Sequence, residues 1–145
     1  MNSQDDDGVK VMKNFVRIAA VFIMMLFIQS CSTNNLEMQA EEQVTVFRNY
    51  FAAHEYKKIY ESCADELRKN IPEDDFVKEM GKIEKNLGTF VSSSRQNMEI
   101  QEFLIGGSRV KLIYLSKYSK ATVIETFIFI NIDGKLMLYN YYPSK

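Results

Sequence analysis

The spacing of the apolar residues changes once along this chain, at Gly88. Before Gly88 they recur every three or four residues, the spacing of one face of an α-helix. After Gly88 they alternate, the spacing of one face of a β-strand. Because the helical patterns form one block and the strand patterns another, the sequence predicts an α+β domain. Two to three N-terminal helices would pack on a curved four-stranded antiparallel sheet.

Short turns separate the four predicted strands. Asp133-Gly134 between two apolar runs is a strong hairpin signal, and Gly106-Gly107 and residues 118–120 mark the other two turns. Turns this short join antiparallel neighbours, so we expect a meander with the second and third strands in the middle. The expected strands are residues 89–103, 108–118, 121–132 and 135–142.

Three helical segments are predicted before Gly88. Asn34 and Glu37 have the spacing of a capping box, which places the first helix start at Asn34. Residues 52–55 interrupt the pattern, and a second helix follows. The third helix begins near Pro72, with three acidic residues in its first turn, and ends at Gly88. The apolar face of the second helix is formed by Tyr56, Ile59, Tyr60, Cys63 and Leu67.

The third predicted strand is apolar on both faces. Helices can cover only one face of the sheet, and the other would leave a larger apolar patch than soluble monomers normally expose. We therefore expect either a partner, such as a second copy of the chain forming a homodimer through the sheet face, or a cavity for a hydrophobic ligand. The two sets of side chains are Val123, Phe127 and Phe129, and Ile124, Ile128 and Ile130.

Residues 1–30 have the layout of a signal peptide. Lys13 and Arg17 precede an uninterrupted apolar run of eleven residues, 18–28. As a helix this run rises about 16 Å, about half the thickness of the hydrocarbon core, which disfavours a permanent membrane span. Three aspartates at positions 5–7 do not suit a positively charged leader, so we expect the true start to be Met12.

The end of this segment, Ile28-Gln29-Ser30-Cys31, resembles the bacterial lipobox. The resemblance implies a lipoprotein in which Cys31 carries acyl chains such as palmitate and becomes the first residue. Several acyl chains anchor a protein firmly to a membrane, where a single chain binds only marginally. Residues 32–36 would then be a tether and 37–145 the folded domain. The expected location is the bacterial cell envelope, facing the periplasm or at the cell surface.

Few other residues suggest site chemistry. Cys63 would be alone in the mature chain and falls on an apolar helix face, which favours a buried structural thiol over a reactive one. The only histidine, His54, is expected at the surface or at a helix cap. With no cysteine–histidine cluster, we expect no metal site and no cofactor. The net charge of −1 and the lack of a basic patch disfavour nucleic-acid binding.

The strand register predicts one polar group within the sheet. A two-residue turn after the third strand would place Glu125 opposite Tyr142, and a turn at Ser119-Lys120 would place Tyr114 opposite Glu125. The three side chains would form a row on an apolar face, where burial disfavours the charged carboxylate. Changing the turn at Ser119 by one residue would move Tyr114 to the other face. Glu125 could be a hydrogen-bonded structural carboxylate or a proton-transfer base.

Helices followed by a long antiparallel meander with an aromatic-rich last strand resemble the nuclear transport factor 2-like superfamily, a cystatin-like α+β cone. The resemblance extends over residues 44–142. Enzymes of that superfamily hold phenols and a carboxyl inside the cone, where they polarise and deprotonate small carbonyl compounds. Within it the chain is similar to bacterial lipoproteins with the domain of unknown function 4019, a family that brings no known reaction. The segments that carry this likeness are residues 47–60, Leu87-Gly88, Glu125-Thr126-Phe127 and Asp133-Gly134-Lys135.

Binding, rather than catalysis, is the function that the sequence favours. No nucleophile–base pair, metal cluster or phosphate loop can be identified in it. We expect a lipid-anchored module that binds a hydrophobic small ligand or a partner protein. The alternative is an isomerase- or dehydratase-type enzyme, with Glu125 as the base and Tyr114 and Tyr142 as hydrogen-bond donors to a developing oxyanion.

Lipid attachment at Cys31 is directly testable. Cells that express the protein and are fed a radioactive fatty acid should label the wild type, because the acyl chains are covalently bound. The Cys31→Ala variant should remain unlabelled. A wild type without label, or a variant labelled to the same extent, would show that Cys31 is not an anchor.

Overall fold

The computed structural model describes residues 31–103 and 107–144, with side chains from residue 35 onward. The chain divides into two compact units, Met1–Asn35 and Leu36–Lys145. The fold below is that of the second unit. The predicted signal peptide and Gly106 of the first turn lie outside the described residues.

Four helices precede the sheet in the described part of the chain. They are α2 (Cys31–Ala52), α3 (Tyr56–Glu61), α4 (Asp65–Asn70) and α5 (Glu73–Leu87). Residues 32–36 lie within α2, so the helix is already formed before Asn34, and the helix start predicted there from the capping box is wrong. No glycine or proline lies in this stretch to end a helix.

The predicted second helix is interrupted by a contact with the sheet. Cys63 forms a parallel bridge with Leu138, and the Ala64 N–H donates a 2.8 Å hydrogen bond to the Leu138 carbonyl. Since these backbone groups bond to the sheet, α3 ends before them and α4 begins after them. Cys63 is buried, as predicted, but it lies in this break. Burial raises the pKa of its thiol to about 12, so the reactive thiolate is scarce at neutral pH.

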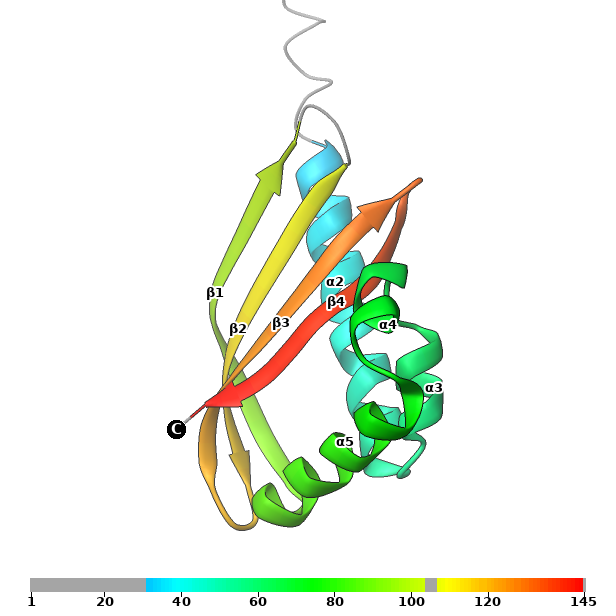
Figure 1. Cartoon of the computed structure of the whole chain (residues 1–145). Coiled ribbons are helices and arrows are strands. Elements are labelled where there is room, and N and C mark those ends of the chain that lie inside the picture. Colours follow the sequence, from blue (N-terminus) through cyan, green and yellow to red (C-terminus); the bar gives the residue numbers. More distant parts are fainter. Residues whose placement is uncertain (1–30, 104–106, 145) are drawn as a thin grey trace, which may run out of the picture. The chain divides into compact units, whose positions relative to one another are not determined.

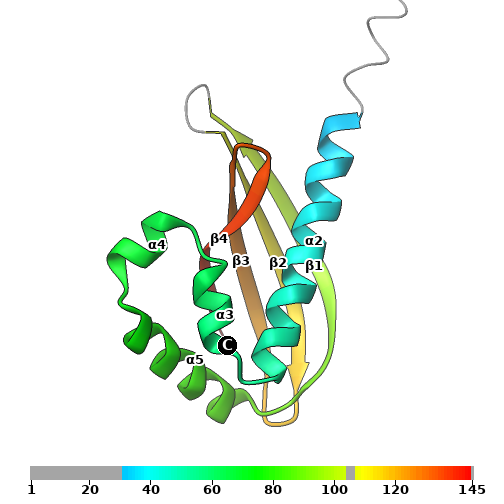
Figure 2. The ribbon, with the colours of Figure 1, turned by 90° about the vertical axis from the view of Figure 1, so that its right-hand side faces the viewer.

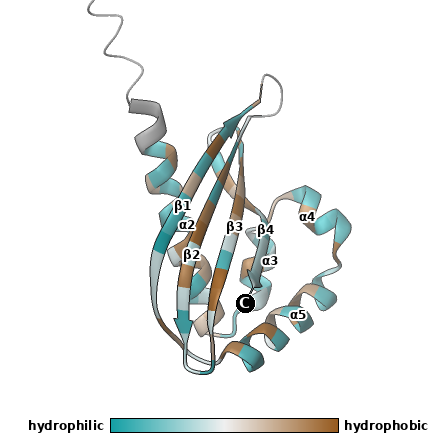
Figure 3. Ribbon diagram, turned by 90° about the vertical axis from the view of Figure 1, so that its left-hand side faces the viewer, coloured by the Kyte–Doolittle hydropathy of each residue, from teal (hydrophilic) through white to brown (hydrophobic). Residues whose placement is uncertain are grey.

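The sheet is an antiparallel meander, as predicted. Its strands are β1 (Phe90–Glu102), β2 (Ser108–Tyr118), β3 (Thr122–Ile132) and β4 (Lys135–Ser144), in the order β1-β2-β3-β4. The helices lie on one face of the sheet (Figures 1 and 2). Seen from the opposite side, the strands lie in front of α2 and this face of the sheet is open (Figure 3).

One face of the sheet, together with the helices, encloses the core. Phe47 of α2 packs edge-on against Phe127 of β3, with ring centroids 5.2 Å apart. Val44 and Phe51 of the same helix are also buried and belong to this core. The buried sheet residues of this face are Ser108, Val110, Leu112, Tyr114, Ser116, Tyr118, Val123, Glu125, Phe127, Phe129, Leu136, Leu138 and Tyr141.

The predicted register is right for one hairpin and wrong for part of the other. Tyr114 lies opposite Glu125, as predicted. In β4 a bulge beside Ile128 and Phe129 inserts one extra residue, so that Pro143 lies opposite Glu125 and Tyr142 lies opposite Thr126. The bulge reverses which side chains point inward. Tyr142 is therefore 42% exposed, and Tyr141 is buried in its place.

Gly88 connects α5 to the sheet and has a backbone that other residues rarely adopt, with φ 77° and ψ −157°. A Cβ atom there would collide with Ser119, whose Oγ accepts a 2.9 Å hydrogen bond from the Thr89 N–H.

Gly88→Ala should lower the free energy of unfolding by about 2–4 kcal/mol, measured by urea denaturation. Gly134 is the control, because it also has positive φ but open space around it. Gly134→Ala should cost only about 1 kcal/mol, and equal losses would contradict the collision.

Candidate functional site

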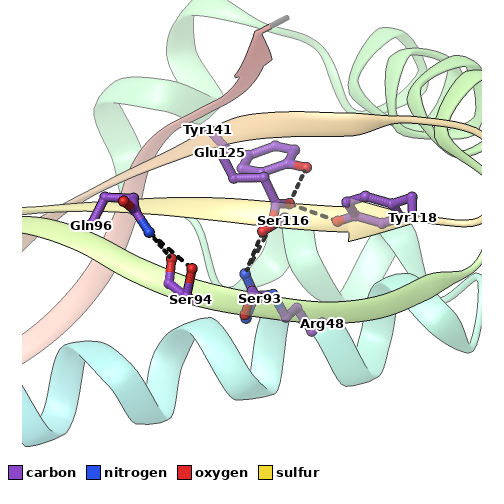
Figure 4. Close-up of polar contacts among 8 residues, drawn as sticks. All are labelled: Arg48, Ser93, Ser94, Gln96, Ser116, Tyr118, Glu125 and Tyr141. Atoms are coloured by element: carbon purple, nitrogen blue, oxygen red, sulfur yellow. Dashed lines mark hydrogen bonds and ion pairs between the residues drawn. The ribbon is translucent and has the colours of Figure 1, made fainter.

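Glu125 of β3 is completely buried and lies at the centre of a polar network (Figure 4). One carboxylate oxygen, Oε1, accepts hydrogen bonds from the hydroxyls of Tyr118 and Tyr141, at 2.7 and 2.8 Å. The other oxygen, Oε2, accepts a 2.9 Å hydrogen bond from Nη2 of Arg48. Three donors from three different elements thus surround one carboxylate.

Arg48 of α2 connects this carboxylate to two further strands. Its Nη1 donates to Ser93 Oγ of β1 at 2.7 Å, and its Nη2 also lies 3.2 Å from Ser116 Oγ of β2. The guanidinium carbon is 4.7 Å from the ring centroids of both Phe90 and Tyr114. The planar cation is therefore held by hydrogen bonds in its plane and by aromatic rings on its faces.

The two phenols act as donors to a charged group in a buried environment. Burial, followed by the negative charge of Glu125, raises the pKa of the Tyr118 hydroxyl well above its ordinary value. The pKa of Tyr141 is raised for the same two reasons, in the same order. Both hydroxyls therefore keep their protons through the physiological range. The arrangement stabilises an ion pair with two fixed donors.

The predicted row of Tyr114, Glu125 and Tyr142 is only partly present. Tyr114 is on the predicted face, but the hydrogen bonds described for Glu125 come from Tyr118, Tyr141 and Arg48. Tyr114 contributes its ring to Arg48 instead. Burial is the largest cause of the raised pKa of its hydroxyl. Tyr142 points away from the network.

The sequence contained a signal for Arg48. It is four residues after Val44 and three before Phe51, on the apolar face of α2. A charged residue within such a face must find an opposite charge or reach solvent. Its side chain is 84% buried, and it finds Glu125. The Tyr141 contact had no comparable signal, because it depends on the bulge.

A groove of about 490 Å³ lies beside this network, between α5 and the end of β4, and we refer to it as the α5–β4 groove. Tyr141 lines the groove, and its hydroxyl donates to Glu125, so this residue connects the groove to the network. The acidic residues Asp75 and Glu79 lie along the α5 side. The remaining lining residues are Leu67, Ile71, Phe76, Met80, Ile83, Asn140, Tyr142 and Pro143.

The open face of the sheet is the second uncovered apolar surface. Leu115 of β2 is 42% exposed there. Ile113 of the same strand and Ile124 and Ile128 of β3 are half-buried on this face. Figure 3 faces this side of the sheet, and no helix of the described chain lies in front of β2 there.

His54 lies at the surface between α2 and α3, as predicted. Its ring nitrogen Nδ1 is 2.9 Å from Glu84 Oε1, and the Tyr56 hydroxyl donates a 2.5 Å hydrogen bond to Glu84 Oε2. This contact joins the helix break to α5. Within residues 35–103 and 107–144, no group of three or more His, Cys, Asp or Glu side chains is placed to hold a metal ion.

Searches with family models and against curated proteins produced no match to this chain.

Loss of the Arg48 guanidinium should destabilise the fold strongly, because it leaves the Glu125 charge buried without its counter-charge. We expect Arg48→Met to lower the free energy of unfolding by about 3–5 kcal/mol in urea denaturation. Adding Glu125→Gln should recover part of this loss, since the buried charge is then removed.

The matched control is Arg95, which pairs with Glu37 and Glu41 at the surface. Arg95→Met should cost less than about 1 kcal/mol, because exposed ion pairs contribute little. Similar losses in Arg48→Met and Arg95→Met would show that the buried pair has no special role.

Proposed function

We propose that this chain is a lipid-anchored binding module of the bacterial cell envelope, with a nuclear transport factor 2-like cone, that takes a hydrophobic ligand in the α5–β4 groove. The observation that carries the proposal is the groove itself. Its volume of about 490 Å³ is in the range of ligand sites, and most of its lining is apolar. Burying apolar ligand surface against such a lining contributes about 25 cal/mol per Å².

The mouth of the groove supports the same proposal. Ile71 and Tyr142 line it and are 40% and 42% exposed, so they offer apolar surface to solvent. Asn140, Asp75 and Glu79 add polar groups beside this surface. An apolar floor with a few polar groups is the usual composition of a site that binds and orients a small molecule.

The open sheet face favours a second candidate partner, another copy of the chain. Leu115 and its half-buried isoleucine neighbours form an apolar band on this face. A homodimer through the sheet would cover the band without involving the groove. The two candidates therefore make separate predictions.

The catalytic alternative, with Glu125 as the base, has less support. Glu125 has no exposed surface, and both of its oxygens already accept hydrogen bonds. Tyr141 lines the α5–β4 groove, whereas Glu125 is not among the lining residues of that groove. A proton-transfer base must come within hydrogen-bond reach of the proton that it removes.

Attachment to the membrane is assigned to the acyl chains of Cys31. In the described part of the chain, no helix is both long and apolar enough to cross a membrane. The cell-envelope location rests on the lipobox resemblance and is tested by the labelling experiment above.

Two matched variants separate the candidate surfaces. Ile71→Asp places a charge in the groove, and Leu115→Asp places one on the open sheet face, at positions of similar exposure. Native mass spectrometry of the protein purified from its own host should detect a bound small molecule in the wild type and in Leu115→Asp, but not in Ile71→Asp. The neutral dye Nile red should likewise bind the wild type and Leu115→Asp, but not Ile71→Asp.

Other outcomes have equally clear meanings. A dimer that is lost only in Leu115→Asp would support the sheet-face partner. An empty monomer that does not bind Nile red would contradict both candidates.

A further inference from the structure

The outer edge of β4 already accepts an extended segment of this chain. β4 is an edge strand of the sheet. At Leu138 that edge is occupied, because Cys63 bridges to it in parallel and the Ala64 N–H bonds to its carbonyl. The chain then turns into α4 at Asp65. Beyond this point the edge of β4 forms one wall of the α5–β4 groove, from Asn140 to Pro143.

Pro143 indicates which backbone groups of β4 face the groove. It lies opposite Glu125 in the ladder and has no N–H to donate. Proline fits an edge strand where its nitrogen points away from the neighbouring strand. Backbone direction alternates along a strand, so the N–H and C=O of Tyr141 point to the same outer side as the C=O of Pro143. The bulge explains why Leu138, three residues earlier, also bonds outward.

We propose that the α5–β4 groove takes an extended peptide segment, which adds to the edge of β4 as a further strand. This inference rests on the proposed function, because it names the class of ligand for the same groove. Backbone hydrogen bonds to Tyr141 and Pro143 provide the attachment, and side-chain contacts provide the selectivity. The edge from Asn140 to Pro143 spans about 13 Å, which accommodates about four residues.

The α5 wall defines the side chains that the peptide should carry. Every second residue of an added strand faces α5, where it meets Phe76, Met80 and Ile83. Asp75 and Glu79 lie one turn apart on that wall, and their side chains are 65% and 58% exposed. Each carboxylate pairs with a lysine of the same helix, an exposed contact that a ligand can replace at little cost. The peptide should therefore have an apolar residue at every second position and a basic residue at its end.

The test uses four synthetic peptides of the form Lys-X-Thr-X-Thr-X-Lys, with X valine, isoleucine, leucine or phenylalanine. Fluorescence anisotropy measures their binding to the full chain in lipid nanodiscs. At least one peptide should bind the wild type and Leu115→Asp equally, and bind Ile71→Asp about tenfold more weakly. Failure of all four peptides to bind the wild type would overturn the inference.

Backbone pairing is tested by N-methylation of the bound peptide. An added strand donates from alternate residues only, so methylating the nitrogens of one alternate set should weaken binding about tenfold, while the other set has little effect. Hydrogen exchange of the wild type should also slow at the Tyr141 amide when peptide binds. Equal effects of the two methylated sets, or an unchanged Tyr141 amide, would overturn strand addition.

The peptide and Nile red results together separate the two proposals. Nile red binding without peptide binding would overturn the peptide inference and leave the hydrophobic site in place. Peptide binding without Nile red binding would support the inference and restrict the site to peptides. No binding of either probe would contradict both.

Discussion

The ion pair between Arg48 and Glu125 is the interaction on which the rest of the structure depends. A buried carboxylate needs a counter-charge and hydrogen-bond donors, and few positions of helix and sheet can supply both. Arg48 connects α2 to three strands through Ser93, Ser116 and Glu125. Apolar packing alone would tolerate a small rotation of α2 about its axis. The guanidinium does not, because its plane is fixed by hydrogen bonds and by the rings on its faces.

Local patterns predicted those parts of the fold that local chemistry determines. The Asp133-Gly134 turn gave the last hairpin, and the acidic first turn and Gly88 gave the limits of α5. The features that the sequence did not reveal depend on contacts between distant residues. The break at Cys63 exists because the backbone beside it bonds to β4. Arg48 could have been identified as an unmatched charge on an apolar face, but its partner depends on the packing of α2 on the sheet.

The position of the groove follows from how α5 and the chain before α4 are attached to the sheet. At one end, the chain before α4 bonds to Leu138. At the other, the carbonyl of Leu87 accepts a 3.0 Å hydrogen bond from the Lys120 N–H. Between these two attachments α5 and the end of β4 are separated by the groove. Tyr141 lines this space, and its hydroxyl donates to Glu125, which is completely buried.

The bulge in β4 has a consequence for the tolerance of this strand to register errors. Residues 141 and 142 are both tyrosines. If the strand paired without its extra residue, Tyr142 would turn inward and could offer Glu125 the phenol that Tyr141 now offers. The carboxylate thus distinguishes poorly between the two alignments. The correct alignment must therefore be selected at positions where the two registers differ in chemistry. Pro143 is one such position, since a shift by one residue would turn its nitrogen toward β3, where the ladder needs an N–H donor that proline lacks.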